Sequence, residues 1–113
     1  NENSDWLPAN DPCALELGGG WHMPSYTEWN NVVISGGWTD WNGPWNSGLK
    51  IHVAGYLDQN IGSLDGRGSV GDYWGSQYST TSGWYVRINS GSCGLWSDGT
   101  KSYGFSVRCL KDN

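Results

Sequence analysis

The sequence predicts an α+β domain in which one helix is followed by short strands and long ordered loops. Three observations support this expectation. A helix-capping sequence precedes an apolar stripe near residue 30, three short segments in the C-terminal third alternate apolar and polar residues, and 18 of the 113 residues are glycine. Because glycine permits tight turns and a period of two is typical of strands, short strands joined by turns are expected to predominate.

The helix is expected over residues 26–35. Ser25-Tyr-Thr-Glu28 has the form of a capping box, in which the Ser25 hydroxyl accepts from the amide three residues later and Glu28 reaches back. Within residues 29–33, apolar side chains recur at spacings of three and four, which produces one apolar stripe. Gly36-Gly37 then supplies a stop signal.

The middle of the chain is predicted to be mostly loop. Residues 38–47 place three Trp among turn residues, with neither a helical nor a strand period. Residues 49–54 alternate apolar and polar side chains and predict a short strand, which residues 55–58 extend or turn. Residues 60–70 are rich in glycine, and Leu64 is expected to be their inward-facing anchor.

Three strands are predicted in the C-terminal third, over residues 69–78, 83–89 and 103–109. The tracts between them consist almost wholly of Ser, Thr, Gly, Asn, Asp, Tyr and Trp, the residues that predominate in recognition loops. Successive side chains of a strand point to opposite faces. In the second strand this alternation turns Trp84, Val86 and Ile88 towards the core and leaves Tyr85, Arg87 and Asn89 exposed.

Length and charge restrict the classes of function. One domain over residues 1–113 is expected, with residues 1–10 leading into it. Only 36% of residues are hydrophobic and 15% charged, but nine Trp and six Tyr can build a core from a few large side chains. The net charge of −5 and six scattered basic residues exclude nucleic acid as an expected partner. No apolar run approaches the roughly 18 residues of a membrane span, so membrane insertion is not expected.

The cysteines and the surface composition favour an extracellular setting. Three Cys, many Trp and an acidic surface rich in small polar residues are typical of secreted or cell-surface domains. The chain begins at Asn1 without Met or a signal peptide, which is consistent with a processed part of a larger surface protein. Three cysteines cannot all pair within the chain, and their pairing cannot be read from the sequence. Cys93 lies in a turn-like segment that is expected to be exposed.

Short motifs follow one another in a fixed order between residues 11 and 109. They are Asp11-Pro-Cys13, Gly20-Trp21, Pro24, Glu28-Trp29, Gly48-Leu-Lys50, Ala54-Gly-Tyr56, Gly62-Ser63, Arg67-Gly-Ser69, Tyr73-Trp74 and Tyr103-Gly-Phe-Ser-Val-Arg-Cys109. No single motif is specific, but the ordered series resembles the Fibrobacter succinogenes major paralogous domain, a family of secreted and surface modules. The chain departs from the family pattern where seven residues separate Cys13 from Trp21, in place of a Cys-Pro-x-Gly-Trp run.

This resemblance implies a C-type-lectin-like fold, with one main helix, a small twisted antiparallel sheet and long irregular loops. Such a fold brings the two ends together, which implies a Cys13–Cys109 disulfide; the alternative pairs Cys93 with Cys109. The chain is also similar to the variable tails of proteins that are diversified by retroelements. In those tails, the segment that ends at the last strand carries residues varied for ligand recognition.

The expected function is non-enzymatic recognition of a protein or a glycan by the loops and exposed strand face of residues 72–103. A flat patch of Tyr, Trp and Arg suits a protein partner, because these residues are favoured at binding hot spots. The alternative is an ordinary solvated sheet face. The residues assigned to ligand binding are Asp72, Tyr73, Tyr78, Ser79, Thr81, Tyr85, Arg87, Asn89, Trp96, Asp98, Lys101 and Tyr103.

Two other functions stay open. The domain can be a structural or assembly module of a bacterial or phage surface protein. The segment from Trp38 to Trp45 can form a calcium-independent carbohydrate platform, because indole faces stack on the apolar faces of sugar rings, or its three Trp can simply anchor a long loop. Neither Glu-Pro-Asn nor Gln-Pro-Asp occurs, so no calcium-dependent sugar site is expected. Structural calcium on the oxygen ligands of Asp58, Asn60, Asp65 or Asp72 stays open, but no cofactor or metal is predicted. No spacing joins Cys93 to a histidine, so no enzymatic activity is predicted.

Overall fold

A computed structural model of the chain describes residues 11–78, 82–100 and 103–111, and within them it has the predicted α+β composition. Short helices precede small antiparallel sheets. The predicted leading segment, residues 1–10, lies outside the described residues. In chain order the elements are α1 (Pro12–Leu17), β1 (Trp21–His22), α2 (Tyr26–Gly36), α3 (Asn42–Asn46), β2 (Tyr56–Leu57), β3 (Leu64–Asp65), β4 (Gly71–Tyr78), β5 (Ser82–Ile88), β6 (Cys93–Thr100) and β7 (Leu110–Lys111).

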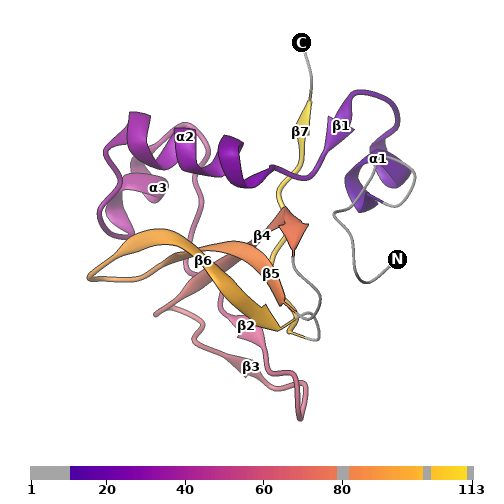
Figure 1. Ribbon diagram of the computed structural model, residues 1–113. Helices are drawn as coiled ribbons and strands as arrows, with labels where there is room; N and C mark the ends of the chain where they lie inside the picture. The colour runs from indigo at the N-terminus through magenta and orange to yellow at the C-terminus, as the bar shows by residue number, and fades with distance from the viewer. Residues whose placement is uncertain (1–10, 79–81, 101–102, 112–113) are drawn as a thin grey trace.

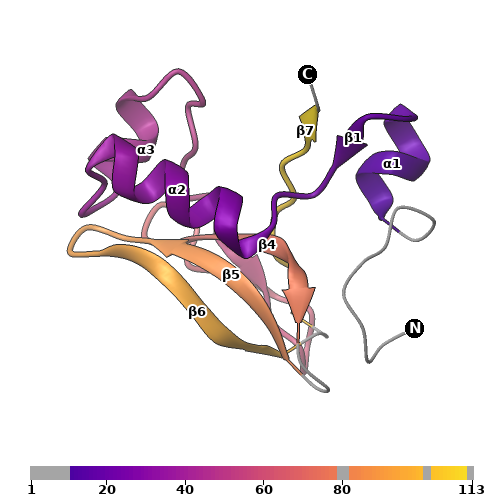
Figure 2. The same cartoon turned by 45° about the horizontal axis from the view of Figure 1, so that its top comes forward.

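The centre of the domain is a three-stranded antiparallel sheet in the order β4-β5-β6. Helix α2 lies across one face of this sheet, and the β2–β3 hairpin lies on the other side (Figures 1 and 2). The register pairs Asp72 with Arg87 and Trp74 with Tyr85, and it places Trp96 opposite Tyr85. We call the side that meets α2 the helix face and the side that carries Trp74 and Tyr85 the aromatic face.

Helix α2 confirms the predicted capping box. The Ser25 hydroxyl accepts from the Glu28 amide, and the Glu28 carboxylate accepts from the Ser25 amide. The helix ends one residue later than predicted, and Gly37 caps it in a left-handed conformation at φ 62°. The same Glu28 carboxylate lies 2.9 Å from His22 Nε2 on β1. Burial alone would raise the pKa of Glu28, but hydrogen bonds from Ser25 and His22 outweigh it and lower that pKa.

The helix face is a close-packed apolar core. Val86 and Ile88 from β5 are each 1% exposed and pack with Trp29 from α2, as the predicted alternation requires. Trp84 points the same way, and its ring meets Tyr26 edge-on with a centroid separation of 4.5 Å. The remaining core residues are Trp38, Ile51 and Tyr73, with Val32, Val33, Val53, Cys93 and Leu95 partly buried against them.

The two ends of the described chain meet beside this core. Strands β1 and β7 pair, and a Cys13–Cys109 disulfide with a Cα–Cα distance of 5.6 Å joins them, which confirms the implied pairing. The seven residues between Cys13 and Trp21 accommodate most of α1, which begins at Pro12. The Asp11 side chain accepts from the amides of Cys13 and Met23, and this link fixes α1 against the strand pair.

The strand predicted over residues 49–54 is wrong. Lys50 has a φ of 51°, which an extended chain cannot contain. The backbone of the next residues is satisfied by other partners: the Ile51 amide donates to the Pro44 carbonyl, and the Tyr73 hydroxyl donates to the His52 carbonyl at 2.8 Å. Ile51 is nevertheless 1% exposed, so the alternation identified a buried residue without a strand.

The third C-terminal strand is also misplaced by the sequence prediction. Residues 103–109 form only isolated bridges, at Gly104 with Leu57 and at Ser106 with Tyr73. The third strand of the sheet is instead β6, which contains the residues predicted to be a loop. The Asn89 side chain accepts from the amides of Gly91 and Ser92, and this turn directs β6 back along β5. Pairing in the sheet therefore overrides the weak strand propensity of Gly, Ser and Asp.

Two expectations for the middle loops need correction. Leu64 is 52% exposed on β3 and does not anchor its loop in the core. The segment 38–47 is not entirely loop, because it contains the short helix α3. Trp38 is buried at 7% exposure beneath that helix, whereas Trp45 on α3 is 52% exposed.

Candidate functional site

The aromatic face is covered rather than open to solvent. Tyr85 was expected to be exposed, but only 6% of its surface is accessible. Phe105 lies over it with ring centroids 4.9 Å apart, and Phe105 also packs against Trp74 at 4.3 Å. Tyr103 stacks on Phe105 at 5.4 Å. The segment 103–106 therefore supplies a second aromatic core on the side that the sequence pattern assigned to ligand.

A carboxylate–guanidinium pair extends this aromatic core. Arg87 donates from Nε to Asp72 Oδ1 at 2.7 Å and from Nη2 to Oδ2 at 2.9 Å, a bidentate arrangement. The Asp72 side chain is fully buried, whereas the Arg87 side chain is 35% exposed. The hydrogen bond to Asp72 raises the pKa of Arg87 further above its already high value, so the guanidinium stays charged. Its Cζ atom also lies 5.8 Å from the ring centre of Tyr56 and 5.6 Å from that of Tyr85.

Two groups of the outer strand β6 stay open to solvent on this face. Trp96 is 51% exposed directly opposite Tyr85, and Asp98 is also exposed. The Tyr85 hydroxyl donates to Asp98 Oδ1 at 2.8 Å. Burial and that hydrogen bond raise the pKa of Tyr85, so the phenol keeps its proton and orients the carboxylate. Arg87, Trp96 and Asp98 form what we call the β6 patch.

The other residues assigned to ligand binding differ in how far the structure exposes them. Tyr73 is 2% exposed in the core of the helix face, so its assignment to a ligand surface is wrong. Asp72 is likewise buried, so its carboxylate does not reach the surface. The side-chain oxygen of Asn89 accepts hydrogen bonds from the amides of its own turn. Tyr103 is partly buried against Phe105. Ser79, Thr81, Lys101 and the side chain of Tyr78 lie outside what the structure describes.

The sequence prediction missed the residues that cover the aromatic face. Tyr56, Trp74 and Phe105 contact Tyr85, Arg87 or one another, yet none was assigned a role there. One sequence pattern indicates that this face is covered. Trp74 and Tyr85 lie on the faces of their strands opposite to Tyr73 and Val86, so large side chains alternate on both faces of one sheet. Such a pattern indicates a sheet that is covered on both sides.

A second exposed aromatic site lies beside the turn between β5 and β6, where the Trp41 amide donates to the Asn89 carbonyl. Trp41, Asn42 and Trp45 from the α3 region and His52, Val53 and Gly68 from later segments line an open groove of about 230 Å³. The ring centroids of Trp45 and His52 are 6.4 Å apart and nearly perpendicular. The groove contains two of the three Trp of the predicted platform, because Trp38 is buried and anchors the loop instead.

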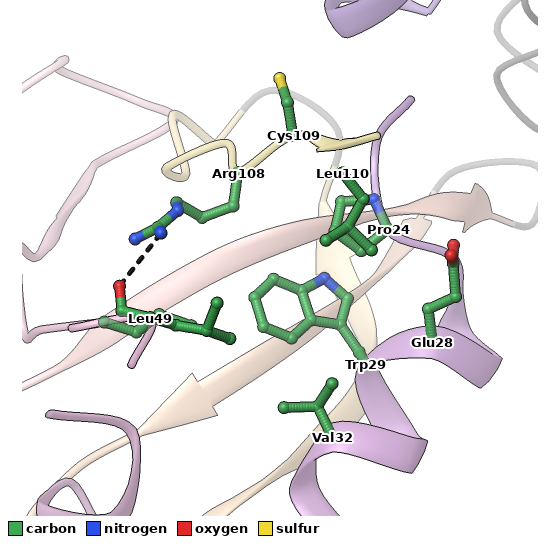
Figure 3. A pocket seen from close by; sticks show the side chains of 9 residues that line it. Pro24, Glu28, Trp29, Val32, Leu49, Arg108, Cys109 and Leu110 are labelled. Carbon is green, nitrogen blue, oxygen red and sulfur yellow. Dashed lines mark hydrogen bonds between the residues drawn. The ribbon is translucent and has the colours of Figure 1, made fainter. Parts of the chain in front are cut away.

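A smaller cavity of about 40 Å³ lies between α2 and the C-terminal segment, beside the disulfide. Figure 3 shows Trp29 and Val32 of α2 facing Leu49, with Arg108 donating to the Leu49 carbonyl at the rim. Pockets for organic ligands usually measure about 300–1,000 Å³, so this cavity holds water at most.

Cys93 is the free cysteine and is unsuited to nucleophilic chemistry. Burial, and to a smaller degree the nearby Asp40 carboxylate, raise its pKa to about 11, so the thiol is protonated at neutral pH. Across the described residues, no group of three or more His, Cys, Asp or Glu side chains is placed to hold a metal ion. None of the helices within those residues has the length and hydrophobicity needed to cross a bilayer.

Comparisons of the chain with protein-family models, with curated proteins and with solved structures found no match. The β6 patch and the groove are therefore the two candidate sites of this domain.

Proposed function

We propose that this domain is a non-enzymatic recognition module that binds a protein partner through the β6 patch. The observation that carries the proposal is the half-exposed indole of Trp96, which lies on a paired strand between a partly exposed guanidinium and an exposed carboxylate. Trp and Arg are the residues most enriched at binding hot spots. Opposite charges on either side of an aromatic anchor also provide orientation for a partner.

The patch is preorganised by the aromatic core beneath it. The Asp72 carboxylate holds Arg87 in a bidentate pair, and the Tyr85 hydroxyl holds Asp98. Side chains that are already ordered lose little conformational entropy when a partner binds. The supporting residues are buried, whereas Trp96 reaches solvent, so this position can differ between relatives without disturbing the core.

The family and the location of the protein are part of the same proposal. The motif series supports a C-type-lectin-like member of the Fibrobacter succinogenes major paralogous domain family, in a secreted or surface protein. The Cys13–Cys109 disulfide is compatible with an extracellular location, where such bonds persist. Diversification by a retroelement would leave a near-copy of the segment 71–109 in the downstream DNA, with differences at adenines.

A binding screen against an array of purified cell-surface proteins tests the proposal. Wild-type domain is compared with Trp96→Ala and with Trp45→Ala, a matched control because these two Trp are exposed to 51% and 52%. For any partner that binds, Trp96→Ala is expected to weaken the affinity by about 30-fold or more, the loss typical of a hot spot. The control variant should bind as the wild type does. Partners that bind both variants equally would contradict the proposal.

A structural or assembly role is the second candidate. It is favoured by three exposed apolar side chains around the β2–β3 hairpin, on Leu57, Ile61 and Leu64, which are 47%, 80% and 52% exposed. Exposed apolar groups of this kind mark contacts with neighbouring modules. In that case association would be lost with Ile61→Ser and unaffected by Trp96→Ala.

A further inference from the structure

We infer that the groove between α3 and residues 52–53 is a separate binding site for one uncharged sugar ring. The site does not depend on the β6 patch, since the two share no residue. Its lining consists of Trp41, Asn42, Trp45, His52, Val53 and Gly68.

The size and shape of the groove suit a single ring. Its volume of about 230 Å³ lies below the roughly 300–1,000 Å³ of sites that enclose drug-sized ligands. The groove is open on one side, and Trp45 at its edge is 52% exposed. A ring can therefore lie against the indoles while its remaining hydroxyls stay in water, so a longer chain can continue out of the groove.

The chemistry of the lining matches a sugar. The two indoles supply flat apolar surface for the C–H face of a pyranose ring. Asn42 and His52 supply polar groups that both donate and accept, as hydroxyl groups require. Within the described residues, no hydrogen bond engages the side-chain amide of Asn42 or the imidazole of His52, so both stay available to a ligand.

Charged ligands fit the groove less well. No carboxylate is among the lining residues, so a cation lacks a counter-charge there. The Lys50 ammonium already lies 5.7 Å from the ring centre of Trp45, which disfavours a quaternary ammonium on the same indole. An anion would be attracted by Lys50, but the net charge of −5 on the chain would repel it.

The walls of the groove are fixed by hydrogen bonds outside it. The Trp41 amide donates to the Asn89 carbonyl at 2.9 Å and ties the groove to the β5–β6 turn. The buried Pro44 carbonyl accepts from the Ser47 hydroxyl at 2.7 Å and from the Ile51 amide at 3.2 Å. The indoles thus stand on a rigid segment, and little ordering is needed when a ring binds.

NMR titration of the folded domain tests this inference. The probes are the methyl glycosides of glucose, galactose, mannose and N-acetylglucosamine, each added into the tens of millimolar, and the signals are the indole Nε1–H resonances. At least one glycoside is expected to shift the Trp41 and Trp45 signals saturably, with a dissociation constant in the millimolar range because a single ring has few atoms. Trp45→Ala should weaken that binding at least roughly tenfold, and Trp96→Ala should leave it unchanged.

His52→Ala serves as a second variant in case Trp45→Ala loses its fold, and it should weaken binding without changing thermal stability. The inference is overturned if none of the four glycosides shifts either indole. It is also overturned if the shifts fall on Trp96, or if tetramethylammonium or sulfate shifts Trp45 while no glycoside does. Loss of sugar binding in Trp45→Ala with intact protein binding would separate this site from the proposed function of the β6 patch.

Discussion

The helix face and the aromatic face belong to the same three strands, and both are largely buried, but different interactions hold them. On the helix face, Val86 and Ile88 pack with Trp29, and the stabilisation comes from hydrocarbon removed from water. On the aromatic face, ring pairs and the Asp72–Arg87 pair predominate, and these interactions depend on direction and on a partner. The first face is therefore sensitive to lost volume, and the second to lost partners and changed ring positions.

This difference explains why the β6 patch lies on the aromatic face. An exposed aliphatic face would supply a partner with apolar contact area but with no directional polar groups. On the aromatic face, the same side chains stabilise the core and carry polar groups to the surface. Arg87 pairs with the buried Asp72 and is itself 35% exposed, and the buried Tyr85 donates a hydrogen bond to the exposed Asp98. The folding core thereby orients the groups of the β6 patch, for which we propose a recognition role.

The largest effect is expected from a change on the helix face. Ile88→Ala removes a side chain that is 1% exposed and should lower the free energy of unfolding by about 3–4 kcal/mol, through lost burial and the cavity left behind. Denaturant unfolding measures it. The matched control, Ile88→Val, should cost only about 1 kcal/mol. If both variants lose the same amount, volume does not determine the stability of this face.

A smaller loss is expected on the aromatic face. Asp72→Asn replaces a fully buried carboxylate and leaves Arg87 without its counter-charge, but that guanidinium is 35% exposed and regains some water. The expected loss is about 2–3 kcal/mol. A double-mutant cycle with Arg87→Met should show that the double variant loses less than the two single losses combined, because it leaves no unpaired charge. Additive losses would mean that the pair is not a cohesive unit.

The sequence predicts those parts of the fold that local chemistry determines. The capping box at Ser25 and Glu28 and the alternation in β4 and β5 need only neighbouring residues, and both predictions are confirmed. The cover over Tyr85 depends on contacts with residues farther along the chain, chiefly Phe105. Alternation along one strand cannot show that a distant loop covers its second face, so Tyr85 was expected to be exposed.

The same limit applies to the candidate sites. Trp96 and Asp98 are assigned to the ligand-binding surface from their residue types, and both side chains are exposed to solvent. Trp38, Trp41 and Trp45 look equivalent in sequence, but the hydrogen bonds of the α3 region bury the first and leave the third half-exposed. Which of several similar aromatic residues reaches solvent is decided by tertiary packing, not by composition.

The smallest effect tests how closely the rings of the aromatic face are packed. A Cβ atom at the buried Gly99 would lie 2.7 Å from Tyr85 Cδ1 and 2.9 Å from Trp74 Cζ3, so one of the rings must move in Gly99→Ala. We expect a loss of about 1–2 kcal/mol in thermal or denaturant unfolding, together with changed near-ultraviolet circular dichroism from the displaced rings. Gly94→Ala on the same strand is the control, because its Cβ would come no closer than 4.0 Å to Trp96 Nε1 and should cost little. If Gly99→Ala proves as mild as this control, the aromatic face is loosely packed, and it orients Asp98 less firmly than the hydrogen bond from Tyr85 indicates.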